Sequence, residues 1–83
     1  MLKTSLEISL YPLGREFVPE IEDFISRIKG HKELICEVNG MSTQIFGDFR
    51  LIMDALTAEM EISFEKYGQS VFVLKIINAC LKA

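Results

Sequence analysis

ELICEVNGMSTQIFGD, residues 33–48, is the stretch that decides the fold of this chain. Apolar and polar residues alternate on both sides of the dipeptide Asn39-Gly40, and a period of two is typical of a half-buried β-strand. Asn-Gly is the pair that a two-residue type I′ turn favours, because both of its positions take positive φ. The stretch therefore predicts a tight β-hairpin.

The two-residue turn fixes which residues of the hairpin face one another. Val38 would lie opposite Met41, and Cys36 opposite Thr43, and cross-strand partners share a face of the sheet. One face then carries Leu34, Cys36, Val38, Met41, Thr43 and Ile45, and the other carries Ile35, Glu37, Ser42, Gln44 and Phe46. The first face is mostly apolar and the second is mixed.

An amphipathic helix is predicted on each side of the hairpin, because apolar residues recur there at helical spacing. The stripes are Phe17, Ile21, Phe24, Ile25 and Ile28 in the first helix, and Phe49, Ile52, Met53, Leu56, Met60, Phe64 and Tyr67 in the second. Gly30 suits the end of the first helix, Asp48 the N-cap of the second, and Gly68 its end. Both stripes are expected in the core.

Two more strands, one before the first helix and one after the second, complete the pattern. Residues 4–11 alternate like the hairpin and are ended by Pro12 and Gly14. Residues 71–79 form the last strand, with Val71, Val73, Lys75 and Ile77 on one face and Phe72, Leu74 and Ile76 on the other.

This order of elements predicts an α+β ferredoxin-like βαββαβ sandwich. Right-handed crossovers give a four-stranded antiparallel sheet of order 4-1-3-2, with both helices on one face. Residues 1–83 are expected to form this single domain.

Composition narrows the class of function. The 83 residues carry nine basic and twelve acidic side chains without a cluster of Lys and Arg, which argues against nucleic-acid binding. The N-terminal residues lack a signal-peptide pattern and no apolar run approaches transmembrane length, so we expect a cytoplasmic protein without a membrane partner. His31 is expected in a solvated loop, and Cys36 and Cys80 as buried thiols on the second and fourth strands, so no metal site or cofactor is predicted.

The sheet face without helices is the candidate site. The end of the first strand lies beside the third and fourth strands, which brings polar side chains together there. These are Ser9, Tyr11, Ser42 and Gln44, with Glu7 and Glu37 nearby. A ring, hydroxyls, an amide and carboxylates can stack on a planar heterocycle, bind its edge and face a cation. The same residues are equally suited to line a subunit interface.

Catalysis has less support in the sequence. No Ser–His or Cys–His pairing is indicated, and no Gly-rich phosphate loop occurs. Glu7 and Glu37 are expected as solvated strand residues, so we predict no catalytic residues and no enzyme activity. The chain is short and the mixed face is half apolar, which favours a homodimer or homotetramer.

Two short segments resemble the YkoF-like family of thiamine- and hydroxymethylpyrimidine-binding proteins. They are SLYPL at residues 9–13 and MSTQIFGD at residues 41–48. The matching positions are Ser9, Tyr11, Pro12, Ser42, Thr43 and Gly47. The resemblance implies ferredoxin-like domains that assemble through their sheets and bind the thiamine pyrimidine for vitamin supply or transport, and it adds Thr43 to the candidate site. The tail at residues 78–83 departs from the Cys-Pro-Gly type of the family's longer members.

Two hypotheses follow from the sequence. The first is a binding protein for thiamine or its hydroxymethylpyrimidine moiety, with Glu7, Ser9, Tyr11, Glu37, Ser42, Thr43 and Gln44 as ligand-binding residues. The second is a ligand-free, self-associating structural or regulatory module.

Overall fold

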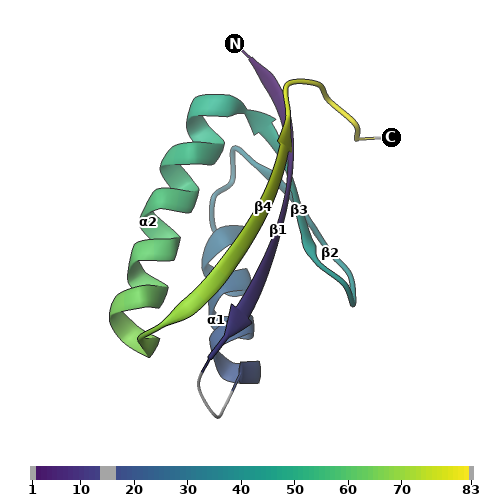
Figure 1. Ribbon diagram of the computed structural model, residues 1–83. Helices are drawn as coiled ribbons and strands as arrows, with labels where there is room; N and C mark the ends of the chain where they lie inside the picture. The colour runs from purple at the N-terminus through teal and green to yellow at the C-terminus, as the bar shows by residue number, and fades with distance from the viewer. Residues whose placement is uncertain (1, 14–16, 83) are drawn as a thin grey trace.

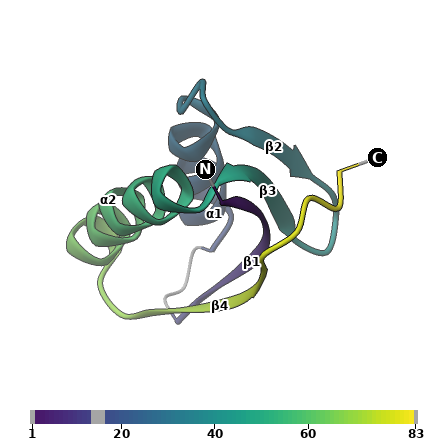
Figure 2. The same cartoon turned by 90° about the horizontal axis from the view of Figure 1, so that it is seen from above.

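The computed structural model describes residues 2–13 and 17–82, so Gly14 and the side chain of Phe17 lie outside the described part. The elements are β1 (Lys3–Pro12), α1 (Phe17–Lys29), β2 (Ile35–Val38), β3 (Thr43–Asp48), α2 (Phe49–Tyr67) and β4 (Ser70–Ile77). The strands form one antiparallel sheet in the order β2-β3-β1-β4, and both helices pack against the same face (Figures 1 and 2). The predicted ferredoxin-like fold is confirmed, since 4-1-3-2 is the same order taken from the other edge.

The hairpin turn is wider than predicted. Cys36 pairs with Ile45 and Val38 with Thr43, so residues 39–42 form a four-residue loop. Neither residue of Asn39-Gly40 has the positive φ that a type I′ turn needs. The Asn39 side chain instead accepts hydrogen bonds from the backbone N–H groups of Met41 (2.8 Å) and Ser42 (3.1 Å). The predicted register is wrong by two residues, and since side chains alternate with a period of two, every side chain keeps its predicted face.

The core lies between the sheet and the two helices. It consists of Leu6, Ile8 and Ile45 from the sheet and Phe24, Ile28, Ile52, Ala55 and Leu56 from the helices, all buried. The Asp48 carboxylate caps α2 by accepting from the Leu51 N–H, and Gly68 ends that helix with a φ of 83°. Both predicted caps are confirmed. None of the helices in residues 2–13 and 17–82 is long and apolar enough to cross a lipid bilayer.

The helices cover less of β4 than the sequence predicts. β4 ends at Ile77, so residues 78 and 79 are not part of the strand, and Cys80 follows it. Leu74 and Ile76, assigned to the helix-facing side, are exposed, as is Phe64 from the stripe of α2. Phe64 meets only the edge of the Phe72 ring, with 5.4 Å between ring centroids. The helices therefore leave much of β4 uncovered.

A polar network joins the two helices beside this core. Arg27 donates to the Glu59 carboxylate (2.9 Å), to the Glu59 backbone carbonyl (2.7 Å) and to the buried Ser63 hydroxyl (2.6 Å). The second carboxylate oxygen of Glu59 lies 2.7 Å from Nε2 of His31. The expectation that His31 is a solvated loop residue is wrong, because the loop after α1 places its ring against α2.

The network sets the charge state of Glu59. Burial raises the pKa of this carboxyl, but the hydrogen bonds and positive charges of His31 and Arg27 outweigh burial and hold the pKa below its ordinary value of 4.5. A carboxyl with a lower pKa in the folded chain stabilises the fold above that ordinary value. The contribution is lost as the pH falls through the folded pKa.

We expect Arg27→Met to lower the free energy of unfolding at pH 7 by about 1–3 kcal/mol, because Glu59 and Ser63 each lose a partly buried hydrogen-bond donor. The variant should also lose less stability than the wild type between pH 6 and pH 3, since the pKa of Glu59 would rise toward or above 4.5. Urea unfolding followed by circular dichroism across this pH range measures both effects.

Lys66→Met is the matched control. Lys66 also pairs with a helix carboxylate, that of Asp23 at 3.3 Å, but its side chain is exposed. This control should change the unfolding midpoint much less than Arg27→Met. Equal effects of the two variants would contradict a stabilising role for the Arg27–Glu59 network.

Candidate functional site

The open face of the sheet carries its side chains in cross-strand rows. The first row, from β2 to β4, is Glu37, Gln44, Glu7 and Lys75. The next row is Ile35, Phe46, Ser5 and Ile77. A polar row therefore runs beside a largely apolar row across all four strands.

Glu7 is the most strongly held side chain of the polar row. Ser42 Oγ donates to one carboxylate oxygen at 2.9 Å, and the Lys75 ammonium lies 3.2 Å from the other. The hydrogen bond from Ser42, followed by that from Lys75, holds the pKa of Glu7 below its usual value despite some desolvation. Glu7 is therefore a fixed negative charge at neutral pH.

Residues 78–82, here called the 78–82 segment, turn back from the end of β4 across the open face toward β2 (Figure 1). The Ser5 hydroxyl donates to the Ala79 carbonyl at 2.7 Å and accepts from the Leu81 N–H at 2.8 Å. The Lys82 ammonium forms an ion pair with Glu37. Phe46, predicted as an exposed residue of this face, is only 6% exposed, so that prediction is wrong.

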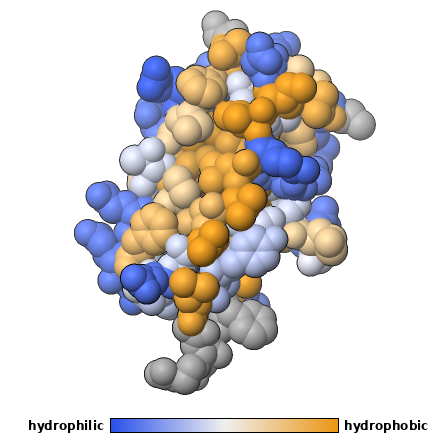
Figure 3. Space-filling view, in the orientation of Figure 1, coloured by the Kyte–Doolittle hydropathy of each residue, from blue (hydrophilic) through white to orange (hydrophobic). Residues whose placement is uncertain are grey.

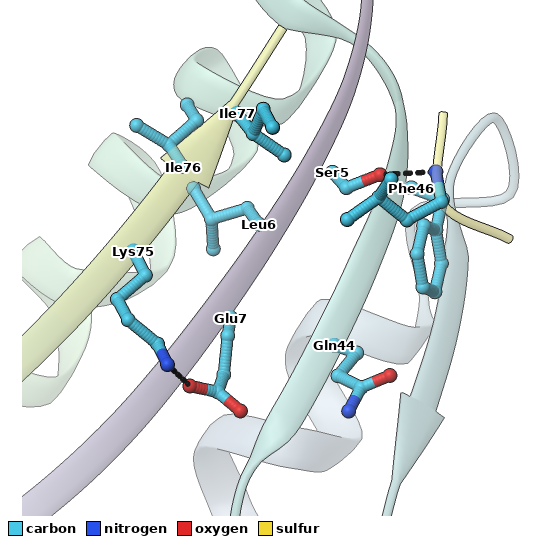
Figure 4. A pocket seen from close by; sticks show the side chains of 9 residues that line it. Ser5, Leu6, Glu7, Gln44, Phe46, Lys75, Ile76 and Ile77 are labelled. Atoms are coloured by element: carbon cyan, nitrogen blue, oxygen red, sulfur yellow. Dashed lines mark hydrogen bonds and ion pairs between the residues drawn. The ribbon is translucent and has the colours of Figure 1, made fainter. Parts of the chain in front are cut away.

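An open-face hollow of about 300 Å³ lies between the two rows and the 78–82 segment (Figure 4). Glu7, Gln44 and Lys75 form its polar wall, and Phe46, Ile77 and Leu81 form its apolar walls. The Glu7 and Lys75 side chains point toward each other at one end of it. The hollow thus combines an ion pair, an amide and an apolar surface.

A strand-end hollow of about 430 Å³ lies at the other end of β1. β1 contributes Ser9, Leu10, Tyr11 and Pro12, the hairpin contributes Met41, Ser42 and Thr43, and α1 contributes Ile21, Phe24 and Ile25. Thr43 is buried on the helix side of the sheet, whereas Tyr11 is exposed. The Thr43 hydroxyl therefore meets an apolar floor on the helix side of the sheet, whereas Ser9 shares the open face with Glu7 and Tyr11.

The structure divides the predicted site residues between these two places. Ser9, Tyr11, Ser42 and Thr43 line the strand-end hollow, and Glu7 and Gln44 line the open-face hollow. Glu37 lines neither and is engaged by Lys82.

Sequence reasoning missed Lys75 and Ser5 as site residues. The signal for Lys75 was available, because the antiparallel pairing that places Ser9 beside Val73 also places Glu7 beside Lys75. No signal was available for Ser5, whose role depends on the path of the 78–82 segment.

The two cysteines are free thiols in different settings. Cys36 is half-buried on the helix side of β2, and burial raises the pKa of its thiol, while Cys80 is exposed. Within residues 2–13 and 17–82, no three His, Cys, Asp or Glu side chains are grouped so that they could hold a metal ion.

No protein-family model and no curated protein matches this chain. Among solved structures, a hypothetical protein from Methanocaldococcus jannascii is 27% identical, with a TM-score of 0.76 over 100% of this chain and 87% of that one. A "putative thiamine biosynthesis/salvage protein" from Thermotoga maritima is 22% identical, with a TM-score of 0.80 over 89% and 81%. A domain of unknown function, DUF77, from Bacillus cereus is 14% identical, with a TM-score of 0.74 over 96% and 79%. These similarities show that the chain has the ferredoxin-like α+β fold of those proteins.

We expect Ser5→Ala to release the 78–82 segment while the sheet stays folded. The variant removes both hydrogen bonds that hold the segment, so the Leu81 amide should exchange with solvent at least about tenfold faster. Hydrogen exchange followed by NMR measures this rate directly. Ser9→Ala, on the same strand and face, is the control and should leave Leu81 protected. Unchanged Leu81 protection in Ser5→Ala would show that the hydrogen bonds of Ser5 do not hold the 78–82 segment.

Proposed function

We propose that the protein binds thiamine or its hydroxymethylpyrimidine moiety in the strand-end hollow, for vitamin supply or transport. The observation that carries this proposal is that the two segments resembling the YkoF-like family meet at one place. Residues 9–12 and residues 41–43, far apart in the chain, line the same hollow. Two short resemblances support a shared binding site more strongly when the fold places both segments at the same hollow.

The chemistry of the strand-end hollow suits a pyrimidine. The ring is flat and apolar on its faces, with nitrogens and an amino group along its edge. Leu10, Phe24 and Ile25 offer an apolar surface for the faces, and the Thr43 hydroxyl, on the same helix side of the sheet, offers a donor and an acceptor for the edge. Tyr11, at the rim, is placed to stack on the ring or on the attached heterocycle.

The described lining of this hollow favours binding over catalysis. Apart from the Tyr11 phenol it contains no ionisable side chain, so proton transfer would lack an acid and a base. The name of the Thermotoga maritima protein, which shares the fold, is consistent with a thiamine-related ligand.

We expect Thr43→Val to weaken binding of thiamine or hydroxymethylpyrimidine by roughly five- to a hundredfold. The substitution keeps the volume of a buried side chain but removes the hydroxyl, leaving a ligand polar group unpaired. Titration calorimetry of wild type and variant with both ligands measures the change. Tyr11→Ala should weaken binding by a similar factor, because the exposed ring contributes to the ligand and not to the core.

Two further variants make this experiment specific. Thr57→Val, on the exposed side of α2, is the matched control and should bind as the wild type does. Gln44→Ala tests the alternative placement, because Gln44 lines the open-face hollow instead. Absence of binding at millimolar concentration of either ligand would overturn the proposal; loss of binding in Gln44→Ala alone would overturn only the placement.

We also propose that the chain self-associates through β4, as a homodimer or homotetramer. β4 is an edge strand, and Val71, Val73, Leu74, Ile76 and Ile77 are each between 37% and 50% exposed. Figure 3, which views the molecule from the β4 side, shows a nearly continuous hydrophobic band along its middle. An apolar edge strand of this kind favours association with another chain.

We expect Val73→Lys to shift the protein from a dimer or larger species to the 9.5 kDa monomer in sedimentation equilibrium at micromolar concentration. The substitution places an ammonium in an apolar interface. Val18→Lys is the matched control, because Val18 is also 50% exposed but belongs to α1 and not to the edge strand β4. A wild-type protein that sediments only as a monomer would overturn this proposal.

A further inference from the structure

The open-face hollow has no role in the proposed thiamine site. We propose that it is a second binding site, which takes an apolar α-amino acid in its zwitterionic form. The proposal rests on the charge arrangement of the polar wall, on the apolar walls beside it, and on the way the 78–82 segment is held.

The polar wall carries one fixed charge of each sign. One carboxylate oxygen of Glu7 lies 3.2 Å from Lys75 Nζ, and the other is held by Ser42 at 2.9 Å. A ligand with a single charge would meet one attractive and one repulsive group side by side. A zwitterion places its ammonium against Glu7 and its carboxylate against Lys75, so that both contacts are attractive.

An α-amino acid has the geometry for this wall. Its ammonium and carboxylate are attached to one carbon atom, and their separation is therefore close to that of the Glu7–Lys75 pair. Gln44 follows Glu7 in the same cross-strand row and adds an amide that can both donate and accept. The wall thus offers partners to each polar group of the ligand.

The remaining walls select an apolar side chain. The Phe46 ring, Ile77 and Leu81 enclose the space beside the ion pair, and Figure 4 shows Phe46 and Ile77 on the same side of Glu7. A branched aliphatic side chain would cover the exposed surface of Ile77 and Leu81. A volume of about 300 Å³ is at the small end of ligand sites, which suits a ligand as small as a single amino acid.

The 78–82 segment is held without using these ligand-binding groups. Its hydrogen bonds go to Ser5 and its ion pair goes to Glu37. Glu7, Gln44 and Lys75 therefore form no hydrogen bond or ion pair with residues 78–82, while Leu81 lines the hollow. The segment forms one wall of the site, and the position of that wall depends on the two hydrogen bonds of Ser5.

The test is a titration of the ¹⁵N-labelled protein with L-leucine, followed by NMR. We expect saturable shifts at Glu7, Gln44, Lys75 and Leu81, with a dissociation constant of about 0.1–1 mM, because the site is small and partly open. 3-Methylbutylamine and 4-methylpentanoate each lack one of the two charges, and each should bind at least about tenfold more weakly than leucine.

Two variants localise the effect. Lys75→Met should weaken leucine binding at least about fivefold, whereas Lys32→Met, which removes an exposed lysine outside both hollows, should leave it unchanged. No shifts at about 20 mM leucine would overturn the proposal, since that concentration is far above the expected dissociation constant. Equal binding of either single-charge analogue, or shifts confined to the strand-end hollow, would overturn it as well.

Discussion

The pairing of β1 along both of its edges is the constraint on which the rest of the structure depends. Glu7 lies opposite Gln44 of β3 and opposite Lys75 of β4, so one register positions the side chains of three strands at once. A slip of one residue would carry Glu7 into the core and move Ile8 into water. The buried core and the two rows of the open face are therefore two results of the same pairing.

The features that could be predicted are those that depend on periodicity. The faces of the hairpin and the caps of α2 are local, and they are confirmed even though the hairpin register is wrong by two residues. Burial is not local, and Phe64, Leu74 and Ile76 are exposed against the prediction. The predicted hairpin is present, but its type I′ turn is wrong: the Asn39 side chain accepts from the loop N–H groups, and neither Asn39 nor Gly40 has positive φ. The burial of Phe46 and the position of His31 could not be predicted, because each depends on one hydrogen-bonding partner far away in the chain: Ser5 for the 78–82 segment, and Glu59 for His31.

The predicted site residues do not lie in one place: they are divided between two hollows, and Glu37 lines neither. The sequence analysis assigns Thr43 and Gln44 to one binding site. Adjacent residues of a strand point to opposite faces, so these two side chains cannot line the same site on the sheet. In the structure, Thr43 lines the strand-end hollow and Gln44 lines the open-face hollow. Glu7, Gln44 and Lys75 lie on the open face and Thr43 lies on the helix side, which gives the two hollows different chemistry within one small sheet.

Ser42 lies between the two hollows. It lines the strand-end hollow, and its hydroxyl donates to Glu7, which lines the open-face hollow. A hydroxyl has one proton to donate. A molecule in the strand-end hollow that accepted this proton would take it from the Glu7 carboxylate, so binding in the two hollows would be linked through this serine. Such a linkage would be reciprocal, and occupation of either hollow would alter the affinity of the other by the same factor.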